Sequence, residues 1–163
     1  MRILRADPLL AVVIKKGSLP ARGWSAPGGK AVVFVDGASR GNPGPAAIGV
    51  VFQDKKGVVL KPLSIKICVS TNNVAEYFAL IFALQEAIIM RVEELEVFTD
   101  SELLAKQLSG EYKVKDEALK RLNLLVKHLR HGFKKVTIAH VPREENRLAD
   151  REANRALDEE LFL

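Results

Sequence analysis

The stretch AVVFVDGASRGNPG at residues 31–44 decides how the rest of the chain is organised. It opens with a β-branched apolar run, residues 31–35, which predicts a strand. Asp36 and Gly37 follow as a turn signal, and GNPGP at residues 41–45 predicts a tight loop. The regular part of the fold therefore starts near residue 31, and its first strand ends on a carboxylate.

Two more strands follow this loop. We predict them at residues 47–53 and 58–69, joined by a hairpin-like turn, DKKG, at residues 54–57. Pro62 lies within the second of them and is expected to bend or interrupt it. Three consecutive strands with short connections indicate an antiparallel meander.

Helices and strands alternate in the remainder of the chain. Helices are predicted at residues 73–89, 101–108, 117–129 and 146–159, and strands at residues 96–99 and 136–140. Asn73 is the predicted cap of the first helix, with Glu76 in the capping-box position. The order predicts an α/β fold with a mixed five-stranded sheet, in which a three-strand antiparallel meander is joined by two parallel strands and flanked by helices.

The composition is that of one globular domain. Of the 163 residues, 48% are hydrophobic and 28% are charged, which excludes a largely disordered chain. The single cysteine, Cys68, excludes an intrachain disulfide, and we interpret it as a buried apolar residue in a reducing compartment. The longest early apolar run, residues 9–14, is far shorter than the roughly 20 residues of a membrane span. We therefore expect a cytoplasmic, monomeric protein without a membrane segment or signal peptide.

The charge is concentrated in residues 1–30, a basic extension that ends in a Gly/Pro-rich linker. Six of the 25 Lys and Arg residues but only one of the 20 Asp and Glu residues lie there, so the remaining chain has 19 of each and is neutral. Two functions for this extension are open. It can bind nucleic-acid backbone through its charge, or residues 9–14 can add an edge strand or cover apolar surface. Residues 31–163 then form the domain that carries the chemistry.

Four acids stand at the ends of predicted elements: Asp36, Glu76, Asp100 and Asp150. Each has a simple structural explanation, as a turn residue, a capping-box acid, a helix cap and a solvated helix residue. Together they favour a shared site, because the first and fourth strands can be parallel neighbours whose carboxyl ends meet. Clustered carboxylates repel one another unless cations neutralise them, and such oxygen ligands suit Mg²⁺ or Mn²⁺. Two such ions catalyse phosphodiester hydrolysis.

Four motifs occur in a fixed order: FVDGASRGNPG at residues 34–44, TNNVAE at 71–76, TDS at 99–101, and HVPREEN at 140–146 followed by Ala149-Asp150 and Ala153-Asn154. They resemble the motifs of the type 1 ribonuclease H family over about residues 31–160. The resemblance implies an endonuclease that hydrolyses the RNA strand of RNA/DNA hybrids with two Mg²⁺ ions, or Mn²⁺ as a substitute. It also implies products with 3′-hydroxyl and 5′-phosphate ends.

By position, the resemblance assigns Asp36, Glu76, Asp100 and Asp150 to metal binding, with Asp36 bridging both ions. It assigns His140 to proton transfer or product departure, for which a solvated strand-end histidine is the alternative. Arg143 follows closely, so either residue can be the one that assists turnover.

The resemblance also implies contacts with the hybrid. Asn42 and Asn72 match residues that contact the minor groove, and Thr71 matches part of a pocket for a DNA phosphate. Asn72 also competes with Asn73 for helix capping, and we predict Asn73 as the cap. Small residues after Asp36 would let the backbone approach the hybrid, and Arg40 can reach a phosphate or remain solvated. The predicted substrate-binding residues are Gly37, Ser39, Arg40, Asn42, Thr71, Asn72 and Ser101.

One departure from the family pattern weakens the expected grip on the hybrid. The segment 110–116 is short and offers only Lys113 and Lys115 as basic residues, where many members carry a basic, aromatic insertion.

Double-stranded RNA and single ribonucleotides in DNA are further candidate substrates. The alternatives to this assignment are another nuclease of the same fold, such as a resolvase or an integrase-like enzyme, and a non-enzymatic nucleic-acid-binding domain. The presence of all four acids disfavours the latter.

Overall fold

Five strands form one mixed sheet in the computed structural model, which describes residues 29–159. The strands are β1 (Lys30–Ser39), β2 (Gly44–Gln53), β3 (Val59–Ser70), β4 (Glu94–Thr99) and β5 (Lys135–His140), in the order β3-β2-β1-β4-β5. The helices are α1 (Asn72–Ile89), α2 (Glu102–Ser109), α3 (Glu117–Arg130) and α4 (Arg147–Asp158), the last preceded by the 3-10 turn η3 (Arg143–Glu145). The predicted α/β class and element order are confirmed. The expectations for residues 1–28 lie outside the described part.

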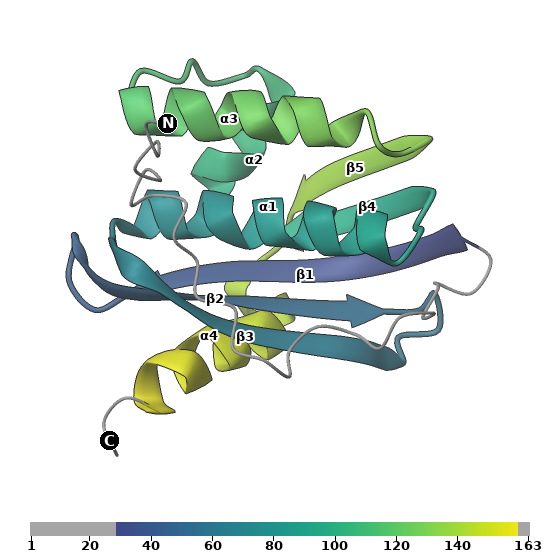
Figure 1. The fold of residues 1–163 in the computed structure, drawn as a ribbon, viewed down its shortest axis with the longest axis horizontal. Coiled ribbons are helices and arrows are strands. Elements are labelled where there is room, and N and C mark those ends of the chain that lie inside the picture. The colour runs from purple at the N-terminus through teal and green to yellow at the C-terminus, as the bar shows by residue number, and fades with distance from the viewer. Residues whose placement is uncertain (1–28, 160–163) are drawn as a thin grey trace, which may run out of the picture.

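The sheet combines both kinds of pairing, as predicted. β1, β2 and β3 form the antiparallel meander, whereas β4 pairs in parallel with both β1 and β5. Helices lie on both sides: Figure 1 shows α1 and α3 above the sheet and α4 below it. The larger core lies between α1 and the sheet and includes Val33, Val35 and Val50, while a small cluster of Ala47, Ala156 and Leu157 lies under α4.

β1 is longer than its sequence predicts. It continues through Asp36 and Gly37 to Ser39, so these two residues form no turn. Its parallel pairing with β4 ends at Val35↔Thr99, but its antiparallel pairing with β2 continues to Ser39↔Ala46. The turn signal at Asp36 therefore marks only the end of the pairing with β4, because the pairing with β2 keeps β1 extended beyond it.

Pro62 does not interrupt β3, contrary to expectation. β3 lies at the edge of the sheet, where a residue without an N–H is tolerated, and Pro62 pairs in register with Val51. The irregularities in this pairing lie elsewhere, between Gly44 and Ala46 and between Phe52 and Gln53. The edge position also makes the Cys68 prediction wrong, since this side chain is exposed on β3.

The helix caps differ from the sequence prediction at α1. Thr71 is its N-cap, and the Thr71 hydroxyl accepts a hydrogen bond from the Val74 N–H at 3.2 Å. Asn73 lies inside the helix, so its prediction as the cap is wrong. Glu76 stands five positions after Thr71 rather than three, so it is not a capping-box acid. Likewise Ser101, and not Asp100, caps α2 through a bond from the Leu104 N–H at 3.2 Å.

α4 approaches β2 closely because Gly49 has no side chain. A Cβ at Gly49 would lie 2.0 Å from the Ala149 carbonyl oxygen and 2.6 Å from the Ala153 nitrogen, both of them backbone atoms of α4. Gly49 is the register partner of Asp36, so α4 lies beside the end of β1 that carries this acid. Among the described helices, none is long and apolar enough to span a membrane.

We expect Gly49→Ala to lower the free energy of unfolding by about 3 kcal/mol, because the added methyl group meets the helix backbone and α4 must move. Urea unfolding followed by circular dichroism measures this. Gly132→Ala is the matched control, since its Cβ would meet the mobile end of the Ile88 side chain at 2.9 Å. Equal losses from both substitutions would contradict the proposed packing of α4.

Candidate active site

Two of the four acids are brought together by the register of β1 and β4. Val35 and Thr99 form the last pair of the parallel ladder, and Asp36 and Asp100 are the next residues on each chain. Both strands run in the same direction, so both carboxylates leave the sheet at the same end. The predicted adjacency of the first and fourth strands is confirmed.

Glu76 joins these acids from α1 because Gly37 lets the helix touch β1. A Cβ at Gly37 would lie 2.3 Å from the Ala75 carbonyl carbon and 2.4 Å from the Glu76 nitrogen. With glycine there, one carboxylate oxygen from each of Asp36, Glu76 and Asp100 lies within 4.8 Å of the others. We call these three residues the acidic triad.

Burial and the charges of neighbouring acids raise the pKa values of two members of the acidic triad, Asp36 and Glu76. Burial, then the charges of Asp100 and Asp150, raise the pKa of Asp36 to about 8. Burial and the charge of Asp36 likewise raise the pKa of Glu76 well above its usual value, although a backbone hydrogen bond from Gly37 lowers it in part. The Asp36 side chain is only 5% exposed, so water cannot screen these charges.

The acidic triad fits a divalent cation in its chemistry. Its ligand atoms are all carboxylate oxygens, the type that Mg²⁺ and Mn²⁺ prefer. The Oε2 atom of Glu76 is buried and has no hydrogen-bond partner among the described residues. A buried acceptor in that state is costly, and a cation would satisfy it.

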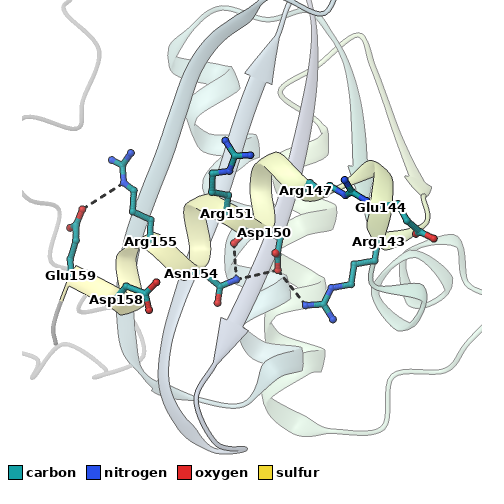
Figure 2. A pocket seen from close by; sticks show the side chains of 9 residues that line it. All are labelled: Arg143, Glu144, Arg147, Asp150, Arg151, Asn154, Arg155, Asp158 and Glu159. Atoms are coloured by element: carbon teal, nitrogen blue, oxygen red, sulfur yellow. Dashed lines mark hydrogen bonds and ion pairs between the residues drawn. The ribbon is translucent and has the colours of Figure 1, made fainter.

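Asp150 lies near the acidic triad but is not a member of it. It occupies the first turn of α4, and its charge contributes to the raised pKa of Asp36. The start of α4 is fixed to β1 by Asn146, whose buried Nδ2 donates to the Val35 carbonyl at 2.9 Å. The Asp150 Oδ1 accepts a hydrogen bond from Asn154 Nδ2 at 3.2 Å and lies 3.5 Å from Arg143 Nη2. Figure 2 shows these three side chains along the same side of α4.

His140 is placed at the same end of the sheet. It is the register partner of Thr99, and the next residue, Val141, donates its N–H to the Thr99 carbonyl at 2.9 Å. Its side chain is exposed. The charge of His140 also lowers the pKa of Glu102, a smaller effect than that of Lys106. The histidine is therefore accessible and lies one strand away from the residue that precedes Asp100.

Three of the predicted substrate-binding residues form one hydrogen-bonded group on the surface. Asn72 Oδ1 accepts from the Ser39 N–H at 3.2 Å and from the Ser39 hydroxyl at 2.7 Å. The Asn72 N–H donates to Asn42 Oδ1 at 3.0 Å. These bonds join the end of β1 and the following loop to the start of α1. These bonds use the side-chain oxygens of both asparagines, whereas the side-chain Nδ2 groups donate none of the bonds within this group.

The other predicted contacts have structural partners of their own. Thr71 and Ser101 cap α1 and α2. Gly37 is buried against α1, and the Arg40 guanidinium pairs with Asp158 of α4. Sequence reasoning assigned no role to Gly49 or Asn146. A glycine inside a strand pattern is a known signal of close backbone approach, but nothing local marks the buried bond of Asn146.

Comparison with known proteins agrees with this geometry. Residues 34–156 match the family described as reverse transcriptase-like. Ribonuclease HI of Halobacterium salinarum is 43% identical over 132 residues, which cover 81% of this chain and 66% of that protein. The crystal structure of ribonuclease H1 from the same organism superposes with a TM-score of 0.78 and 42% identity, over 80% of this chain and 98% of that one.

The chain belongs to the type 1 ribonuclease H family. A second solved structure, LC11-RNase H1 in complex with an RNA/DNA hybrid, has a TM-score of 0.77 and 42% identity, and the match covers 80% of this chain and 99% of that one. The predicted five-stranded architecture is thus shared with these structures. The chain spans 66% of the length of the Halobacterium relative and 36% of that of three mycobacterial relatives.

The raised pKa values predict how pH changes the stability of the metal-free protein. Unfolding returns Asp36 and Glu76 to ordinary pKa values, so the unfolded chain loses protons that the folded chain retains. The protonated Asp36 carboxyl therefore stabilises the fold fully below the ordinary pKa of an aspartic acid, and this contribution is lost as pH rises through about 8. The contribution of Glu76 changes with pH in the same direction. We expect the melting temperature in EDTA to fall between pH 5 and 8, and Mg²⁺ to restore it most at the upper end.

Asp36→Asn removes one of the two titrating groups and relieves the repulsion, so we expect it to reduce this decline and stabilise the metal-free protein at pH 8. Glu144→Gln, an exposed acid on η3, is the matched control. A decline of the same size in Asp36→Asn would show that Asp36 does not carry the effect.

Proposed function

We propose that this chain is a ribonuclease H that hydrolyses the RNA strand of RNA/DNA hybrids. The acidic triad carries this proposal: three carboxylates, from β1, from α1 and from the residue that follows β4, lie within 4.8 Å of one another, with Asp150 beside them. A structural role for these acids would not explain why the fold buries Asp36 and crowds the other acids around it. The relatives named ribonuclease H support the same activity.

The four acids would hold Mg²⁺, or Mn²⁺ as a substitute. When bound, two ions would supply an activated water for in-line attack on the phosphodiester and would stabilise the leaving oxygen, giving 3′-hydroxyl and 5′-phosphate ends. Asp36 would be the central ligand, because its carboxylate lies within 4.8 Å of those of Glu76 and Asp100 and also interacts with the charge of Asp150. Its burial keeps competing water away from the ligand oxygens.

The group formed by Ser39, Asn42 and Asn72 would contact the substrate. Its amide N–H donors suit the acceptors that base edges present in the minor groove, and short polar side chains can sense 2′-hydroxyl groups. Thr71 would contact a phosphate of the DNA strand with its hydroxyl. Ser101 would contact the substrate beside Asp100, the residue before it in the chain. Arg40 would have to leave Asp158 to reach a phosphate.

His140 would assist proton transfer at the leaving group or help the product depart. Its exposure and its position beside Thr99, the residue that precedes Asp100, support this assignment. A proton-transfer aid contributes roughly 10²–10⁴-fold to turnover.

An assay with end-labelled substrates tests the activity. We expect cleavage of the RNA strand in a hybrid with Mg²⁺ or Mn²⁺ and none in EDTA. Glu76→Gln should lower turnover by about 100-fold or more without unfolding, since Thr71, not Glu76, caps α1. Glu117→Gln, which changes an exposed acid at the start of α3, is the matched control and should leave turnover unchanged.

Other results of the assay would be decisive. Cleavage that persists in EDTA, or 2′,3′-cyclic phosphate ends, would exclude the metal mechanism. Preferential cleavage of duplex RNA would show that duplex RNA, not the hybrid, is the substrate.

His140→Ala should lower turnover while the affinity for the hybrid is kept. A larger loss of turnover in Arg143→Ala would assign the role proposed for His140 to Arg143 instead.

We further propose that residues 31–163 form the catalytic domain and that residues 1–30 add affinity for the nucleic-acid backbone. The six basic residues of that segment support this, since the rest of the chain is neutral. Phosphate contacts release counterions, so deleting residues 1–29 should weaken hybrid binding in EDTA and reduce its salt dependence, with an unchanged melting temperature. A large fall in melting temperature with an unchanged salt slope would instead make the segment structural.

A further inference from the structure

The fourth acid of the site is engaged by other side chains. Asp150 is not part of the group whose oxygens lie within 4.8 Å of one another. Its Oδ1 atom lies 3.5 Å from Arg143 Nη2 and also accepts a hydrogen bond from Asn154. This oxygen is therefore engaged by one protein cation and one protein donor, with which a metal ion would have to compete.

Arg143 is well placed to act on the whole site. It lies on η3, directly between the end of β5 and the start of α4. Its positive charge reaches Asp36 as well, where it opposes the pKa increase caused by burial and by the other acids. The side chain is 80% exposed, so it can swing into solvent when its partner moves away.

The neighbouring arginines of α4 behave differently. Arg147 and Arg151 follow at intervals of four residues, are exposed, and form no ion pair among the described residues. Figure 2 shows Arg143 directed toward Asp150 and Arg151 directed away from it. Of the arginines near the acids, Arg143 is therefore the one whose charge is engaged with the site.

We propose that Arg143 is an internal counterion that holds Asp150 outside the acidic triad in the metal-free protein. Binding of divalent metal must then displace the guanidinium, and Arg143 sets the metal concentration that the site requires. Removing Arg143 frees Asp150 and removes a competing positive charge. This inference rests on the proposed metal-dependent function, but it concerns metal affinity rather than turnover.

The probe is Mn²⁺, titrated into the full-length, metal-free protein at pH 7.5 and low salt, with free Mn²⁺ measured by electron paramagnetic resonance. We expect Arg143→Ala to bind Mn²⁺ about two- to fivefold more tightly than the original chain, the range for losing one exposed ion pair. The gain should shrink as salt screens the charges. Arg143→Lys keeps the charge and should stay close to the original affinity. Arg147→Ala removes the same charge one turn away and is the matched control.

A double-mutant cycle with Asp150→Asn assigns the effect to this pair. If Arg143 acts through Asp150, then Arg143→Ala should give no gain in Mn²⁺ affinity when residue 150 is already asparagine. Circular dichroism of each variant shows that it is folded. Should Arg143→Ala unfold the protein, Arg143→Gln, which retains most of the side chain, takes its place.

Several outcomes would overturn the proposal. They are an unchanged or weaker Mn²⁺ affinity in Arg143→Ala, an equal gain in Arg147→Ala, a gain that persists with Asp150→Asn, and no Mn²⁺ binding by the original chain. Loss of hybrid affinity with unchanged Mn²⁺ affinity would make Arg143 a phosphate contact instead. Hybrid cleavage is measured separately. A chain that shows the Arg143 effect without cleaving hybrid refutes the proposed function alone, and a chain that cleaves without the effect refutes this inference alone.

Discussion

The site depends on two helices reaching the end of one strand from opposite faces of the sheet. Successive residues of β1 point to opposite faces, so Asp36 and Gly37 serve different helices. Gly37 lets α1 approach with Glu76, while Gly49, the partner of Asp36 on β2, lets α4 approach with Asp150. Any side chain at either glycine would separate a helix from the strand. The distances among the carboxylates therefore depend on the absence of a side chain at Gly37 and at Gly49.

Crowding buried acids is unfavourable, and the rest of the fold must offset it. The core on the α1 side does so through apolar packing and through one buried polar group. The Tyr77 hydroxyl donates to Gln107 at 2.8 Å and accepts from Asn123 at 3.2 Å, which ties α1 to α2 and α3. Further along α1, Glu86 pairs with Lys61 of β3 at 2.8 Å. These contacts hold α1 at Tyr77, next to Glu76, and again at Glu86, so the helix cannot withdraw to relieve the repulsion.

The sequence predicted the fold class, the element order and the meeting of Asp36 with Asp100, because hydrophobic periodicity and turn residues are local signals. It failed where a neighbouring strand or a competing side chain decides the outcome. β1 passes through Asp36 and Gly37 because β2 pairs with them, and Cys68 is exposed because β3 lies at an edge. Thr71 displaced Asn73 as the cap, a choice between adjacent polar residues that periodicity does not resolve. The ion pair between Arg143 and Asp150 could not be predicted from the sequence either, since it depends on how η3 leads into α4.

The position of Pro62 has a consequence for how this protein meets copies of itself. The edge of a sheet exposes unpaired backbone groups, and a second chain can add a strand there and begin aggregation. Near the start of β3, Pro62 has no N–H to donate, and the side chain of Lys61, just before it, donates to Glu86. An added strand could not pair continuously along this edge. A residue that the sheet tolerates only at its edge thus makes this edge a poor template for an added strand.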